Sequence, residues 1–134
     1  MSGRMVAAAK SPIHCCYISA ACVDGSGMGP VAIIRALPSG PFATVIFLID
    51  SFCLGVKNVI VTIRTKLELD ELLEGLQKHN KMEPVTAGVA CGYVEAALAY
   101  AAALGFQPHD DYRKAKPIWG TIDPESIPEH YQFG

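Results

Sequence analysis

Charged residues are scarce in this sequence. They make up 18% of its 134 residues, while hydrophobic residues make up 51%, and a chain of that balance does not stay disordered over most of its length. The 11 Lys and Arg residues are scattered and the net charge is −2, so nucleic-acid binding is not expected. With few charges to coat a monomer, we expect a homo-oligomer, by default a homodimer.

The sequence also has no C-x-x-C pair. Its five cysteines form an odd set, and the adjacent Cys15 and Cys16 would point to opposite faces of a strand, which makes them poor partners for one metal ion. This pattern is typical of reduced thiols in the cytoplasm rather than of a disulfide framework. No cofactor is predicted from these motifs.

No hydrophobic run suits a signal peptide or a membrane anchor. The apolar stretch at 5–9 is too short for a signal, so we predict a flexible leader at 1–12 followed by a single domain at 13–134. The stretch 85–106 is long enough to cross a bilayer. It is rich in alanine and carries Glu95 near its middle, which favours a buried helix and no membrane association.

Strand patterns fill the first half of the chain. We predict strands at 14–20, 31–37, 42–49 and 59–63 from their β-branched and aromatic residues. The Pro-Ser-Gly-Pro turn at 38–41 predicts an antiparallel hairpin. The glycine-rich run at 24–30 is interpreted as a loop and not as a phosphate cradle, because a strand rather than a helix follows it.

Helical patterns fill the second half. Thr65 and Glu68 match a capping box, which begins a helix that ends near Asn80 in a left-handed residue. A second helix is predicted from Pro84 to about residue 104, ended by Gly105.

Strands followed by helices indicate an α+β fold. We predict a mainly antiparallel meander of three to four strands, with the two long helices packed on one face. The expected core combines strand residues that share a face with one helical leucine stripe: Ile33, Val45, Phe47, Ile49, Val59, Val61, Leu69, Leu72, Leu76, Val94, Leu98 and Leu104.

The first candidate site follows the third predicted strand. Asp50 would supply a base or metal ligand, Cys53 a nucleophile, and Lys57 a charge that favours the thiolate. The alternative is a turn in which Asp50 bonds to local backbone and Cys53 is a small buried hydrophobe.

The second set of candidates lies in and after the second helix. Glu95 sits in the most apolar helix and, if buried, needs a partner such as Lys57 or His109. His109 and Asp110 belong to a His-Asp-Asp-Tyr cluster that suits metal binding. The alternatives are an exposed Glu95 and a helix start at 110, where aspartate favours the N-terminus.

Two segments, VIFLIDSFCLGVKNV at 45–59 and YAAALGFQPHDDY at 100–112, resemble motifs of a family of small, uncharacterised bacterial proteins. The resemblance implies no known activity. The order of three strands and a helix also resembles ribonuclease H-like folds, in which an Asp of the first strand and a helical Glu bind magnesium. The predicted first strand at 14–20 lacks that Asp.

Two functions follow from these patterns, and whether the protein is an enzyme stays open. The first is a small intracellular binding or assembly protein that self-associates, with an unknown small-molecule ligand. The second is a metal-dependent hydrolase that uses Asp50, Glu95, His109 and Asp110. Convergence of these groups at one cleft would favour the hydrolase.

Overall fold

The computed structural model describes residues 8–23, 28–50, 55–107 and 110–125. Five antiparallel strands form one sheet in the order β4-β3-β2-β1-β5. The strands are β1 (Ile13–Ser19), β2 (Met28–Ala36), β3 (Phe42–Asp50), β4 (Gly55–Arg64) and β5 (Met82–Val85), and the helices are α2 (Ala20–Val23), α3 (Lys66–His79), α4 (Ala87–Ala103), α5 (Asp110–Ala115) and the 3-10 turn η1 (Lys116–Trp119). The α+β class is therefore confirmed, with five strands instead of three or four.

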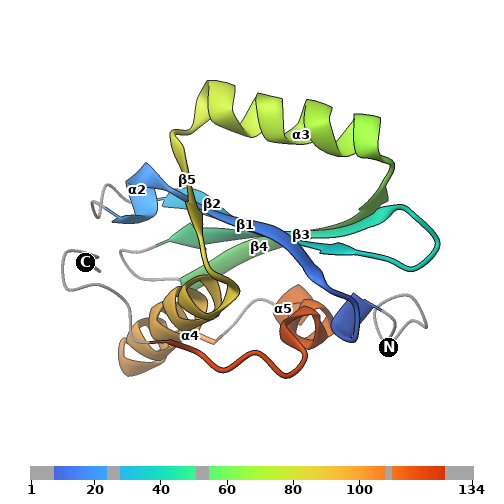
Figure 1. Cartoon of the computed structure of the whole chain (residues 1–134). Coiled ribbons are helices and arrows are strands. Elements are labelled where there is room, and N and C mark those ends of the chain that lie inside the picture. The colour runs from blue at the N-terminus through green and yellow to red at the C-terminus, as the bar shows by residue number, and fades with distance from the viewer. Residues whose placement is uncertain (1–7, 24–27, 51–54, 108–109, 126–134) are drawn as a thin grey trace.

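The two long helices cover opposite faces of the sheet (Figure 1). The prediction that both pack on one face was wrong, and the strands explain why. Both β2 and β3 carry nearly unbroken runs of buried residues, so alternate side chains point to both faces and each face needs a cover. Ala32, Ile34 and Ile46 pack with α3, while Val45 and Phe47 belong to the larger cluster that includes α4.

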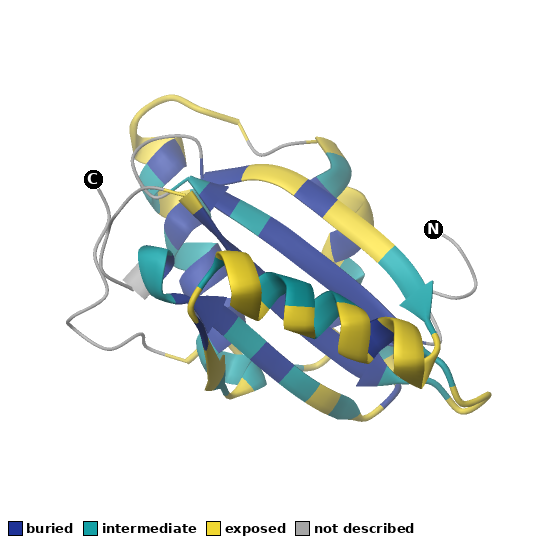
Figure 2. Ribbon diagram, turned by 90° about the horizontal axis from the view of Figure 1, so that it is seen from above, coloured by how far each residue is buried: buried dark blue, intermediate teal, exposed yellow. Residues whose placement is uncertain are grey.

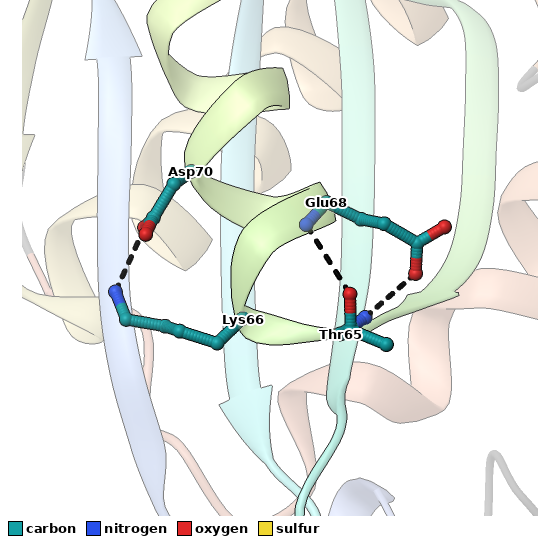
Figure 3. Close-up of polar contacts among 4 residues, drawn as sticks. All are labelled: Thr65, Lys66, Glu68 and Asp70. Carbon is teal, nitrogen blue, oxygen red and sulfur yellow. Dashed lines mark hydrogen bonds and ion pairs between the residues drawn. The ribbon is translucent and has the colours of Figure 1, made fainter.

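The capping box that begins α3 is confirmed (Figure 3). The Glu68 amide donates to Thr65 Oγ1 at 3.2 Å, and the Thr65 amide donates to Glu68 Oε1 at 2.9 Å. An exposed ion pair between Lys66 and Asp70 follows at 2.8 Å. The predicted left-handed end was wrong, because Asn80 has an extended backbone with φ −140°.

The leucine stripe of α3 is only partly covered. Leu69 is fully buried, whereas the leucines at 72, 73 and 76 are half-buried against the sheet. Figure 2 looks down on α3 and shows exposed residues along its outer side above the buried strands. Two predicted core residues are exposed instead: Val61, at 47%, lies on the outermost strand, and Leu104, at 49%, caps α4.

A fifth strand was missed just before α4. Pro84, predicted to start the helix, belongs to β5 and pairs with Tyr17, and α4 begins after the N-cap Thr86. The glycine stop is confirmed, because Gly105 has φ +90° and the amides of residues 105 and 106 donate to carbonyls of the last turn. No helix in the described part of the chain is long and apolar enough to span a membrane.

The small residues of α4 have partners within the chain. A Cβ atom on Gly92 would lie 2.0 Å from the Glu125 carbonyl oxygen, so the C-terminal segment crosses the helix where glycine leaves room. The Glu125 amide donates to the Gly88 carbonyl at 2.9 Å. Further along, a Cβ on Gly55 would meet Ala97 and Ala101 at 3.0 Å. This helix therefore receives a loop and a strand of its own chain.

A buried arginine ties both ends of the domain to the sheet. Arg35, 5% exposed on β2, donates from Nε to the Ile118 carbonyl at 2.6 Å, from Nη1 to the Ser11 carbonyl at 2.6 Å and from Nη2 to the Trp119 carbonyl at 2.9 Å. Ser11 lies within the range predicted as a leader and is buried. One planar guanidinium thus holds the segment before β1 and the turn η1 together.

We predict that Arg35→Met lowers the free energy of unfolding by about 3 kcal/mol or more, because it leaves three buried carbonyls without donors. Urea unfolding followed by circular dichroism measures this change. Arg64→Met is the matched control, since Arg64 ends β4 and its side chain bonds, among the described residues, to the Thr62 side chain alone. It should cost within about 0.5 kcal/mol. Equal costs for the two variants would contradict the proposed role of Arg35.

Candidate functional site

A cleft of about 650 Å³ opens beside α4, where the segment from α5 to Pro124 folds back over the helix. Its lining combines one carboxylate, two cations, a thiol, an indole and several apolar residues: Ala9, Cys91, Glu95, Arg113, Lys116, Pro117, Trp119, Gly120, Ile122 and Pro124. The volume lies within the range typical of small-molecule sites. Gly120 is required here, because its φ is +57° and a Cβ would lie 2.3 Å from the Ala9 carbonyl oxygen.

Glu95 is held in the cleft by a tyrosine. It is half-buried on α4, and Tyr112 of α5 donates its hydroxyl to Glu95 Oε1 at 2.8 Å. Burial, and then this hydrogen bond, raise the pKa of the Tyr112 phenol. No other hydrogen bond or ion pair of Glu95 forms within the described residues, so its second oxygen is open to a ligand's donor.

Trp119 forms the floor of the cleft. Its ring stacks on Phe47 with centroids 5.4 Å apart and planes 11° from parallel, and the residue is 4% exposed. The indole N–H faces Tyr112 closely enough to oppose the rise in the phenol's pKa. The geometry is not that of a hydrogen bond, however, and the buried Nε1 has no partner among the described residues. A buried donor without a hydrogen-bond partner is uncommon in a folded protein.

Cys91 lies one helical turn before Glu95 and is buried. Burial first, and then the Glu95 carboxylate, raise the pKa of the Cys91 thiol to about 11, while Lys116 opposes the rise. At neutral pH the group is therefore a thiol and not a nucleophilic thiolate. The shift also indicates that Glu95 and Lys116 both act on the same part of the cleft.

Two cations stand at the mouth of the cleft. Arg113 and Lys116 are exposed, and neither forms an ion pair with a described residue. The neighbouring Lys114, by contrast, lies 3.8 Å from Asp111. The lining of the cleft thus combines two cations with the Glu95 carboxylate.

The strand-end candidates lie on a different part of the molecule. Asp50 ends β3 and pairs with Gly55 and Met28 in the sheet. Strand alternation places it on the face that α3 covers, whereas Glu95 belongs to α4 on the opposite face. Lys57 is exposed, with Nζ 3.5 Å from Met28 Sδ, and forms no ion pair with the described residues. The structure does not bring Asp50 and Glu95 together.

Cys53 and His109 lie outside the described residues. Asp110 is exposed at the first position of α5, where an acidic residue suits a helix start. Within the ranges that the structure describes, no three His, Cys, Asp or Glu side chains gather as a metal site. The metal-dependent hydrolase stays a prediction.

The sequence reasoning missed most of the cleft. It selected Glu95 but proposed Lys57 or His109 as its partner, whereas the partner is Tyr112 of the same His-Asp-Asp-Tyr cluster. It assigned no role to Cys91, Arg113, Lys116 or Trp119. The one sequence feature that could have indicated the cleft is the single tryptophan of the chain, Trp119, which lies two residues after Pro117.

We predict that Glu95→Gln speeds alkylation of Cys91 severalfold at pH 8, because the nearby negative charge that raises the thiol's pKa is removed. Labelling with iodoacetamide, followed by peptide mass spectrometry, measures the rate at Cys91. Glu74→Gln, on α3 across the sheet, is the matched control and should leave the rate unchanged. A rate that does not respond to Glu95→Gln would show that the carboxylate does not act on the thiol.

Comparisons with known proteins give no relative: the chain matches no family model, no curated protein and no solved structure.

Proposed function

We propose that this protein is a self-associating binding domain and that the cleft beside α4 takes a small zwitterionic ligand. One observation carries the proposal: the Glu95 carboxylate with an open oxygen, two cations without an ion pair among the described residues, and the Trp119 side chain line the same cleft. An ammonium group suits Glu95, and a carboxylate suits Arg113 and Lys116. Charged groups that line one cleft and form no ion pair with each other or with another described residue support binding more than structure.

The apolar part of the lining indicates the rest of the ligand. Ile122, Pro117 and Pro124 lie beside the charged groups, and such a surface suits an aliphatic side chain. We therefore propose an amino acid or short peptide with an aliphatic side chain as the ligand class. The neutral state of Cys91 argues against thiolate chemistry in this cleft, so binding alone is proposed.

Trp119, as the single tryptophan, reports on this cleft directly. We predict that L-leucine and leucyl-leucine change its fluorescence in a saturable manner. N-acetyl-leucine lacks the cation and leucinamide lacks the carboxylate, so each should bind at least about tenfold more weakly, since a charge-assisted hydrogen bond contributes roughly 1.5–3 kcal/mol. Fluorescence titration measures all four probes under one condition.

Two variants test the role of the carboxylate and the role of a cation of the cleft independently. Glu95→Gln should weaken binding of leucine but not that of N-acetyl-leucine, and Lys116→Gln should weaken leucine but not leucinamide. Lys114→Gln is the matched control, because that ammonium is paired with Asp111 and does not line the cleft. Absence of any saturable change with the zwitterions, or equal binding of all four probes, would overturn the proposed ligand class.

The homodimer is proposed on separate grounds. Large hydrophobic side chains remain exposed on the outermost strand, at 49% for Ile60 and 47% for Val61, and a long apolar edge strand is available for pairing with another chain. None of the described cysteines, at 15, 16, 22 and 91, forms a disulfide. Free thiols suit the reducing cytoplasm, where we propose that the dimer acts.

We predict that sedimentation equilibrium at about 50 µM gives a species of twice the 14.3 kDa chain mass, in line with the micromolar affinity of a modest interface. A mass that stays at 14.3 kDa up to that concentration would contradict self-association. It would leave the proposed ligand cleft standing, because the cleft lies within one chain.

A further inference from the structure

The two edges of the sheet are protected to different degrees. β5 forms one edge with four residues and contains Pro84, which lacks a backbone N–H, and short strands with proline are ordinary protection against edge pairing. β4 forms the other edge with ten residues, and no described strand pairs with its outer side. Figure 2 shows this strand, which runs directly into α3, with exposed residues along the rim of the sheet.

The centre of β4 is open for pairing. A bulge interrupts its ladder with β3 near Lys57, at the start of the strand, and bulges discourage edge pairing only locally. From Val59 to Ile63 every residue is β-branched, which favours pairing with another strand. No proline or charge interrupts this segment.

One hydrogen bond indicates which backbone groups face outward. The Val59 amide donates to its neighbouring Asn58 side chain, at 2.9 Å to Oδ1, as an edge amide without a strand partner does. In an antiparallel strand, the N–H and C=O of one residue point to the same side, and those of the next residue point to the other side. We therefore assign Val59, Val61 and Ile63 to the set that points to the open edge.

We infer that β4 pairs antiparallel with β4 of a second copy, with Val61 opposite Val61 of the partner at the two-fold axis; this deepens the proposed homodimer and rests on it. In this register Val59 lies opposite Ile63 of the partner, so the outward-pointing residues match and apolar side chains meet apolar ones. A shift by one residue would set outward amides against inward ones and place Lys57 opposite Arg64, two like charges.

Charge favours a second copy as the occupant. The same register places Lys57 opposite the partner's Thr65, which lies beside the partner's Glu68 in the capping box. Glu68 uses only Oε1 in that box, so its other oxygen is open to the ammonium. Arg64 of the same chain is near enough to act on the Glu68 charge, but it bonds back along its own strand to Thr62 Oγ1 at 3.1 Å, and no ion pair with a described residue occupies the Glu68 carboxylate. The two-fold axis repeats this pair at both ends of the interface.

A cross-linking pair tests the register. Opposed residues of a hydrogen-bonded pair have Cα atoms about 5.5 Å apart, within the range of a disulfide. Val61→Cys should therefore give a covalent dimer under mild oxidation with oxidised glutathione, seen on non-reducing gels and mapped by mass spectrometry. Ile60→Cys is the matched control, because Ile60 is equally exposed at 49% but lies opposite Thr62 of the partner. It should cross-link at least about tenfold more slowly, as diagonal neighbours lie about 7–8 Å apart.

The cross-linking results distinguish the register, the β4 interface and the homodimer itself. Faster cross-linking of Ile60→Cys than of Val61→Cys would overturn the register. A wild-type dimer with neither variant cross-linked above the background of the native cysteines would overturn the β4 interface and leave the homodimer standing. A monomeric wild type would overturn both.

A second variant tests the charge pair. Glu68→Gln keeps the capping acceptor without the charge, so it should weaken the dimer affinity roughly two- to tenfold at low salt and little at high salt.

Discussion

The structure depends on one buried cation, Arg35, which forms no ion pair with a carboxylate of the described residues. Burial lowers the pKa of Arg35, and a charge in that position is stable only because three carbonyl dipoles take its donors. Those carbonyls come from opposite ends of the domain. Ser11 precedes β1, whereas Ile118 and Trp119 belong to η1. Their convergence on β2 fixes η1 under the sheet and therefore places Trp119 at the floor of the cleft.

A second constraint is the two-sided sheet. Because β2 and β3 bury side chains on both faces, the chain divides its two long helices between them. The two helices bury different amounts of their own surface. α4 contributes a continuous set of buried residues, whereas α3 buries only Leu69 fully. The face under α4 has room for a charged cleft because glycines at 88 and 92 admit the C-terminal segment.

Local signals in the sequence predicted local structure well. The capping box at Thr65 and the glycine stop at Gly105 involve neighbouring residues, so their patterns are complete in a short window. β5 was missed because its four residues include a proline and have little strand preference of their own. The partner of Glu95 lies 17 residues away, and the carbonyls that bind Arg35 lie up to 84 residues away. Contacts of that kind carry no periodic signal, although the unbroken apolar runs of β2 and β3 did indicate burial on both faces.

The β4 pairing and the cleft are related through the symmetry of the proposed dimer. A two-fold axis perpendicular to the sheet keeps each face on its own side, so the two five-stranded sheets would join with both α4 layers below and both α3 helices above. The two clefts would then open on the same side of one continuous sheet. Gly55, which starts β4, packs directly on Ala97 and Ala101 of α4. The strand that forms the interface therefore shares a rigid contact with the helix that carries Glu95, and ligand binding and assembly would act on one connected layer.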